Sequence, residues 1–323
     1  MAILIDTPRW PAHGTLFGHL VSDRSLTELH RFARSVEIPL RAFDHDHYDV
    51  AERHLERLVA AGALPVTSRE LVSRLTAGGL RVRRPEKLPA AASLIDPLRA
   101  LWADLVTNFH RRARPTGAER GLVEPACGSL YDAGLGDDLL AAWSAPTRHY
   151  HDPRHLWMML AALDQLGEAT PALRLATPTL RLATWFHDAV YDGVPGRDEE
   201  ESARWAERAL PGLVDDATVA EVARLVRLTT THRPDPDDAA GQALSDADLS
   251  TLAGPEARYW MYARAIRLEY AHVDDAAFRT GRATVLQGFL DTPRLFHTET
   301  GHRLWEGQAR ANISRELDFL LHD

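Results

Sequence analysis

The side chains best suited to chemistry are His187 and Asp188, which are adjacent at the end of an apolar run. Burying an imidazole beside a carboxylate is costly unless something compensates, and a divalent cation is the simplest compensation. Two other polar groups lie in similar surroundings, at residues 148–155 upstream and 244–249 downstream, both next to apolar segments. Together the three segments predict a metal site made of imidazole and carboxylate ligands.

The upstream segment offers two histidines at helical spacing. His151 and His155 lie four residues apart, so on a helix they would face the same way. His155 begins an apolar stripe and is expected to point into a helical bundle. With 16 histidines in the chain, chance pairs are expected, but three separated motifs in helical contexts seldom coincide by chance.

Three motifs, Tyr-His-x-x-x-His, Phe-His-Asp-Ala-Val-Tyr-Asp and Asp-x-Asp-Leu, occur in that order. They resemble the HD superfamily of metal-dependent phosphohydrolases, and within it a bacterial subgroup of predicted HD phosphohydrolases, over about residues 96–323. The resemblance implies an all-α bundle whose metal ligands are His155, His187, Asp188 and Asp248.

Two assignments within these motifs follow by similarity alone. HD relatives generally use the second aspartate of Asp-x-Asp, so Asp248 is preferred over Asp246, although the assignment could be reversed. Similarity to the mammalian cyclic-nucleotide phosphodiesterases implies that His151 is the proton donor. His149 is the weaker alternative to His151 or His155.

Several other residues have a functional and a structural interpretation. Glu199 and Glu200 would orient water by the same resemblance, or would simply be favoured by the helix dipole. His232 would contact phosphate or a second metal ion, or would be a cation at a helix C-terminus. A guanidinium matches phosphate oxygens bidentately, so candidate phosphate ligands are Arg148, Arg233 and Arg282.

Two imidazoles and two carboxylates suit Mn²⁺, Fe²⁺, Ni²⁺, Zn²⁺ or Mg²⁺. The expected function is hydrolysis of a phosphomonoester or phosphoanhydride, with a nucleotide as the expected substrate, through a metal-activated water held by the His/His-Asp/Asp site. The alternative is a metal-dependent nucleotide-binding or sensing module without turnover.

Composition and charge limit the partners and the cellular location that the sequence allows. A net charge of -9 argues against nucleic acid or anionic membrane as a partner, and no apolar run approaches the roughly 20 residues of a membrane span. Cys127 is the single cysteine and is interpreted as a small buried side chain; a chain without disulfides favours a cytoplasmic location. The sequence is compatible with a homo-oligomer.

The length of 323 residues suits two domains. In residues 1–80 strand and helix alternate three times, which predicts a small α/β domain with a parallel sheet. Its expected strands are residues 2–5, 38–43 and 64–66, and its expected helices are 25–36, 50–61 and 67–75. Residues 81–95 carry Pro and Arg and are interpreted as a linker to the all-α domain at 96–323.

Polar residues follow the predicted strands of the first domain, where open parallel sheets bind ligands. In an extended segment His45 and His47 would share one side, which is compatible with a metal or phosphate site. The alternative is a solvated loop, and the two interpretations are about equally favoured. Asp-x-Pro-Arg-Trp, His19-Leu, His-Tyr-Asp and Ser-Arg-Glu-Leu resemble a small bacterial and phage family, domain of unknown function 4031, which implies no activity. A third hypothesis makes this domain a nuclease or nucleotide-processing unit centred on Asp6, Asp46 and His47.

Overall fold

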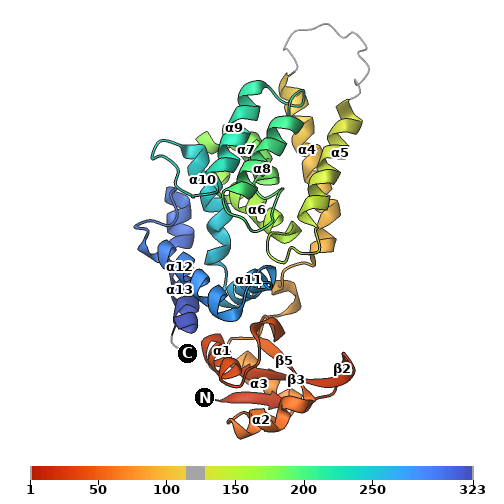
Figure 1. The fold of residues 1–323 in the computed structure, drawn as a ribbon, viewed down its shortest axis with the longest axis vertical. Coiled ribbons are helices and arrows are strands. Elements are labelled where there is room, and N and C mark those ends of the chain that lie inside the picture. The colour runs from red at the N-terminus through yellow and green to blue at the C-terminus, as the bar shows by residue number, and fades with distance from the viewer. Residues whose placement is uncertain (1, 114–127, 322–323) are drawn as a thin grey trace. The chain divides into compact units, whose positions relative to one another are not determined.

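The protein is described by a computed structural model covering residues 2–113 and 128–321 (Figure 1). It forms two compact units. The first comprises Met1–Leu88, Leu252–Pro293 and Gln308–Asp323, and the second comprises Pro89–Thr251 and Arg294–Gly307. The break at Leu88 falls inside the expected linker, whereas the two late segments, which we expected in the helical domain, group with the N-terminal residues. Cys127 lies outside the described residues.

The first unit contains a mixed sheet. Its strands are β1 (Ile3–Asp6), β2 (Trp10–Ala12), β3 (Thr15–Ser22), β4 (Phe43–Asp44), β5 (His47–Ala51) and β6 (Leu64–Val66). The order is β4-β5-β3-β1-β6, with β2 paired to β3. β1 and β6 are parallel, but the β1–β3, β2–β3, β3–β5 and β4–β5 pairs are antiparallel, so the expectation of a parallel sheet was wrong.

Two tight turns explain the antiparallel pairing. His13 and Gly14 both have positive φ between β2 and β3, and His45 has positive φ between β4 and β5. Such left-handed residues match the twist of a two-residue hairpin. Because residues 45–46 turn rather than extend, His45 and His47 do not occupy one strand face as expected.

The first unit also contains α1 (Leu26–Ser35), α2 (Leu55–Ala60), α3 (Ser68–Ala77), α11 (Glu256–Glu269) and α12 (Asp275–Asp291). Ser25 and Thr67 accept hydrogen bonds from backbone N–H groups at the starts of α1 and α3, as their capping motifs predict. The predicted second strand is instead a 3-10 turn, Leu40–Ala42, that leads into β4. The predicted helix from residue 50 begins later, because its first residues belong to β5.

One apolar core joins distant parts of the first unit. Ile5 and Leu29, from β1 and α1, are fully buried with Tyr48 of β5. Trp260 and Ala263 of α11 belong to the same cluster. The N-terminal sheet therefore completes its core with residues more than 200 positions later in the chain.

The described part of the second unit is helical, as expected. Its helices are α4 (Ile95–Ala113), α5 (Gly128–Trp143), α6 (Pro153–Ala169), α7 (Pro171–Phe186), α8 (Arg197–Ala209), α9 (Asp216–Leu228) and α10 (Ala239–Leu249), and it includes the first residues of α13 (Glu299–Leu321). Trp102, Trp143 and Trp185 lie at the centre of its core. No helix in the described ranges has the length and apolarity to cross a membrane.

Candidate metal centre

Three helices of the second unit bring the predicted ligands together. His155 lies in the first turn of α6, His187 is the C-cap of α7, and Asp248 lies near the end of α10. α6 packs on α7, and α10 packs on both. A buried helix core thus fixes the backbone of each of these residues. Helices α6, α7 and α10 are labelled in Figure 1.

The donor atoms of His155, His187 and Asp248 all lie within 4.8 Å of one another. His155 Nε2 and His187 Nε2 are 3.3 Å apart. Asp248 Oδ1 lies 3.1 Å from His155 Nε2 and 3.8 Å from His187 Nε2. Two donors bound to one ion at about 2.1 Å are separated by roughly 3.0–4.2 Å, depending on their angle. These side chains therefore have a spacing that fits a single ion.

Asp188 adds a second carboxylate beside the imidazoles. Its Oδ2 is 3.1 Å from His187 Nε2 and 3.9 Å from His155 Nε2. It does not belong to the set of three mutually close donors. Asp188 is consequently a ligand candidate at one edge of the group, next to the two histidines.

The tautomer of His187 is set by the backbone. Its Nδ1 lies 2.8 Å from the carbonyl oxygen of Thr184, which can only accept, so Nδ1 carries the proton. In the neutral imidazole, Nε2 then carries the lone pair, which faces the other possible ligand atoms. This second hydrogen bond on the far nitrogen is typical of metal-bound histidines.

The electrostatics of the group favour a cation. Although burial lowers it, the carboxylates of Asp188 and Asp248 raise the pKa of His187 to about 9. Burial raises the pKa of Asp188, yet His187 and the neighbouring imidazoles hold it well below its usual range. Negative charge therefore gathers at one point among buried side chains, where either a proton or a metal ion would be stabilised.

Asp246 and Asp248 have different surroundings although both lie on α10. Asp246 is fully buried and accepts hydrogen bonds from the backbone N–H of His297 at 2.6 Å and of Thr298 at 2.8 Å, and from the Thr298 hydroxyl. Asp246 therefore holds the residues that lead into α13, and Asp248 is the aspartate at the histidine pair.

His151 and His232 both approach the group. His151 Nε2 is 3.9 Å from Asp188 Oδ2, and its ring stacks on Tyr191 at 3.9 Å. His151 precedes α6, which begins at Pro153, so it occupies a turn and not the helix expected from its spacing. His232 Nε2 is 3.5 Å from Asp248 Oδ2.

Arg148 has a positioning role that sequence reasoning missed. It is buried, and its guanidinium donates to the carbonyl oxygens of His151 at 3.1 Å, Asp188 at 2.7 Å and Ala189 at 2.9 Å. These bonds tie the segment before α6 to the segment after α7. They favour the support of His151 and Asp188 over the phosphate contact expected from the sequence.

The other predicted residues have partners of their own. Glu199 accepts from the N–H of Gly196 at the start of α8, and Glu200 pairs with Arg227 and Arg204. Arg282 forms a buried bidentate pair with Glu316, and both belong to the first unit, so the structure does not group Arg282 with the histidines.

A second group of the same composition, His19, His47 and Asp49, belongs to the first unit. A family model described as "Protein of unknown function (DUF4031)" matches residues 3–78, which confirms the resemblance of the N-terminal domain. No curated protein and no solved structure matches the chain. The HD resemblance of the helical part therefore rests on its sequence motifs.

Proposed function

We propose that this protein is a metal-dependent phosphohydrolase that acts on a phosphomonoester or phosphoanhydride, with a nucleotide as the substrate class. The observation that carries the proposal is the convergence of His155, His187 and Asp248 on one point, with Asp188 beside them. The order and type of these residues resemble the HD superfamily, whose members hydrolyse phosphate esters.

The metal would be held by His155, His187, Asp188 and Asp248, all at least largely buried. When bound, a divalent ion lowers the pKa of a water ligand and polarises a phosphoryl oxygen. Mn²⁺, Fe²⁺, Ni²⁺, Zn²⁺ and Mg²⁺ all accept nitrogen and oxygen ligands, so the donor set leaves the identity of the ion open.

His151 would donate a proton to the leaving oxygen. Its ring is held by Tyr191 and its Nε2 is near Asp188, so the imidazole is oriented beside the ligand group. A positioned general acid contributes about 10²–10⁴-fold to a rate. His232 contacts Asp248 from a different element, the turn after α9, and the exposed Arg233 follows it in the chain. We assign these two residues to the phosphate.

The experiment measures metal content and turnover on the full chain. Wild type, Asp188→Ala and Asp248→Ala are compared by elemental analysis, and each is assayed with p-nitrophenyl phosphate and a nucleotide panel in Mn²⁺. We expect phosphate release by wild type, and loss of one equivalent of metal together with turnover in the variants.

His151→Gln should keep the metal while kcat falls by about 10²–10⁴. His149→Gln is its matched control, because His149 lies two residues away and is the weaker sequence candidate. If His149→Gln loses turnover and His151→Gln keeps it, the assignment of the proton donor is wrong. Stoichiometric metal and nucleotide binding with no turnover under any metal would replace the hydrolase with the binding module.

A further inference from the structure

The N-terminal sheet carries a polar cluster that the proposed hydrolase site does not use. His19 lies on β3 directly opposite Asp49 on β5, and His47 lies two residues before Asp49 on the same strand. Side chains two apart on a strand share a face, and directly opposed residues share a face across the ladder. The antiparallel register therefore gathers two imidazoles and a carboxylate on one side of the sheet.

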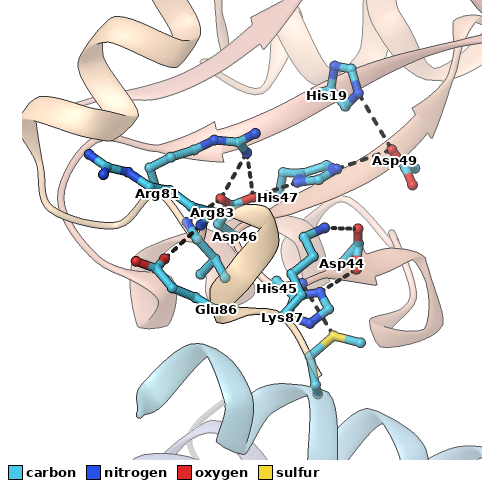
Figure 2. Close-up of polar contacts among 12 residues, drawn as sticks. His19, Asp44, His45, Asp46, His47, Asp49, Arg81, Arg83, Glu86 and Lys87 are labelled. Atoms are coloured by element: carbon cyan, nitrogen blue, oxygen red, sulfur yellow. Dashed lines mark hydrogen bonds and ion pairs between the residues drawn. The ribbon is translucent and has the colours of Figure 1, made fainter. Parts of the chain in front are cut away.

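Both imidazoles direct the same nitrogen at the same oxygen. Nε2 of His47 lies 3.5 Å from Asp49 Oδ1, and Nε2 of His19 lies 3.9 Å from it. The ring centroids of the two histidines are 5.0 Å apart. Donor atoms of all three residues lie within 4.8 Å of one another. Figure 2 shows His19 and His47 approaching Asp49 from two sides.

The opposite nitrogen of each ring is held by its own carboxylate. Nδ1 of His19 lies 3.2 Å from Asp6 Oδ2, and Nδ1 of His47 lies 2.7 Å from Asp46 Oδ1. The side chains of Asp6 and Asp46 are both 0% exposed. A carboxylate behind each neutral imidazole holds the ring proton on Nδ1, so the Nε2 lone pair can bind a metal ion. The same arrangement is found behind metal-binding histidines.

Other groups fix these two carboxylates in turn. Asp6 accepts from the backbone N–H of His19 at 2.7 Å and from the Ser68 hydroxyl at 2.5 Å. Ser68 follows β6, the parallel neighbour of β1, so the two residues meet at the carboxyl end of that strand pair. Asp46 accepts from the N–H of Val82 at 2.7 Å. The imidazoles are thus preorganised from behind by the fold.

Charge and access also suit a cation. Asp6, Asp46 and Asp49 bring three carboxylates to the two rings, and the Arg81 guanidinium, 3.0 Å from Asp46, offsets one of them. The Asp49 side chain is 49% exposed, and His19 and His47 line a cavity of about 280 Å³. The side chains of His19 and His47 are 27% and 14% exposed, so solvent reaches both residues as well as Asp49.

We propose that His19, His47 and Asp49 form a second, independent site for a divalent transition-metal ion, supported from behind by Asp6 and Asp46. Two imidazoles and one carboxylate that leave positions for water are the ligands of hydrolytic zinc sites and of non-haem Fe²⁺ sites. The site lies within residues 3–78, the part of the chain that the family model matches.

The test counts Zn²⁺ equivalents retained by metal-stripped full-length protein. Asp49→Asn and His47→Gln should each retain one equivalent fewer than wild type. Asp248→Asn reports separately on the group of His155, His187 and Asp248 in the second unit, the helical-unit site. The double variant Asp49→Asn/Asp248→Asn should lose the Zn²⁺ bound at both sites. The difference caused by Asp49→Asn does not depend on whether the helical-unit site binds, so the two proposals can fail separately.

His45→Asn is the matched control. His45 belongs to the same His-x-His motif, but its ring lies against Asp44, and Asn tolerates its positive φ. It should retain the wild-type number of equivalents. Asp49 is half exposed, so an unchanged circular dichroism spectrum should accompany its replacement.

Asp6→Asn tests the support from behind. It should weaken Zn²⁺ binding at this site by about 10–100-fold while the site itself is kept. A role of Asp6 in folding alone would leave the Kd unchanged. If wild type and Asp49→Asn retain equal Zn²⁺, the proposal is overturned, and the cluster is then a protonated His47 paired with Asp46 and Asp49.

Discussion

Asp246 and Asp248 provide a matched pair of substitutions with opposite expected outcomes. The two residues lie on α10, two positions apart, and both are replaced by asparagine. Asp246 accepts from two backbone N–H groups and one hydroxyl, whereas Asp248 faces His155 and His187. The same chemical change should therefore cost stability at one position and metal at the other.

The expected magnitude at Asp246 follows from its hydrogen bonds. Asparagine has one acceptor oxygen, so one of the N–H groups of His297 and Thr298 loses its partner and meets an amide NH₂. A buried donor without an acceptor costs about 1–3 kcal/mol, with charged partners at the upper end. Asp246→Asn should lower the free energy of unfolding by about 2–3 kcal/mol and leave the metal stoichiometry unchanged.

The assay is urea unfolding of metal-free protein beside elemental analysis of metal-loaded protein. Asp248→Asn should lose one equivalent of metal. Loss of the metal from Asp246→Asn with retained stability would contradict this assignment. Asp246 would then be the ligand, and other contacts would hold the residues that lead into α13.

Two other predictions concern stability. A Cβ at Gly301 would lie 2.3 Å from Asp246 Oδ2, so Gly301→Ala should destabilise the protein by about 1–3 kcal/mol in urea unfolding. Gly307→Ala, on the same helix with nothing within 4 Å, should stabilise it by about 0.5–1 kcal/mol; equal effects would contradict the close contact. Burial lowers the pKa of His30 to about 3, so below pH 6.5 the unfolded chain takes up a proton that the folded protein does not. Between pH 7 and pH 5 wild type should therefore lose about 2 kcal/mol more stability than His30→Gln, and parallel pH profiles would show that His30 is not kept neutral.

Local sequence signals were sufficient to single out the two histidines that meet in the second unit. The adjacent His187 and Asp188 follow an apolar run, and His155 begins another, so each could be placed at the buried end of a helix from its neighbours alone. The choice of Asp248 over Asp246 came from resemblance, and the structure groups Asp248 with the two histidines. The contacts of Arg148 could not be predicted, because they join carbonyl oxygens of segments 40 residues apart.

The N-terminal cluster depended on pairing that the sequence signals only weakly. His19 and Asp49 face each other because β3 pairs with β5 across 30 positions. The turn before β5 contains His45 at positive φ in place of a glycine, so the usual hairpin signal is missing. Without the turn, the segment resembles an extended strand followed by a helix, which is how we predicted it.

The discontinuous make-up of the first unit has a consequence for biosynthesis. Its core joins Ile5 and Leu29 to Trp260 and Ala263. At about 5–20 residues per second, roughly 9–34 s pass between the release of Leu88 from the ribosome and the release of Trp260. Throughout that interval an apolar surface of the nascent N-terminal sheet lacks its covering helix. Ribosome-associated chaperones would meet this surface first, and a premature stop anywhere before residue 260 would leave it uncovered for good.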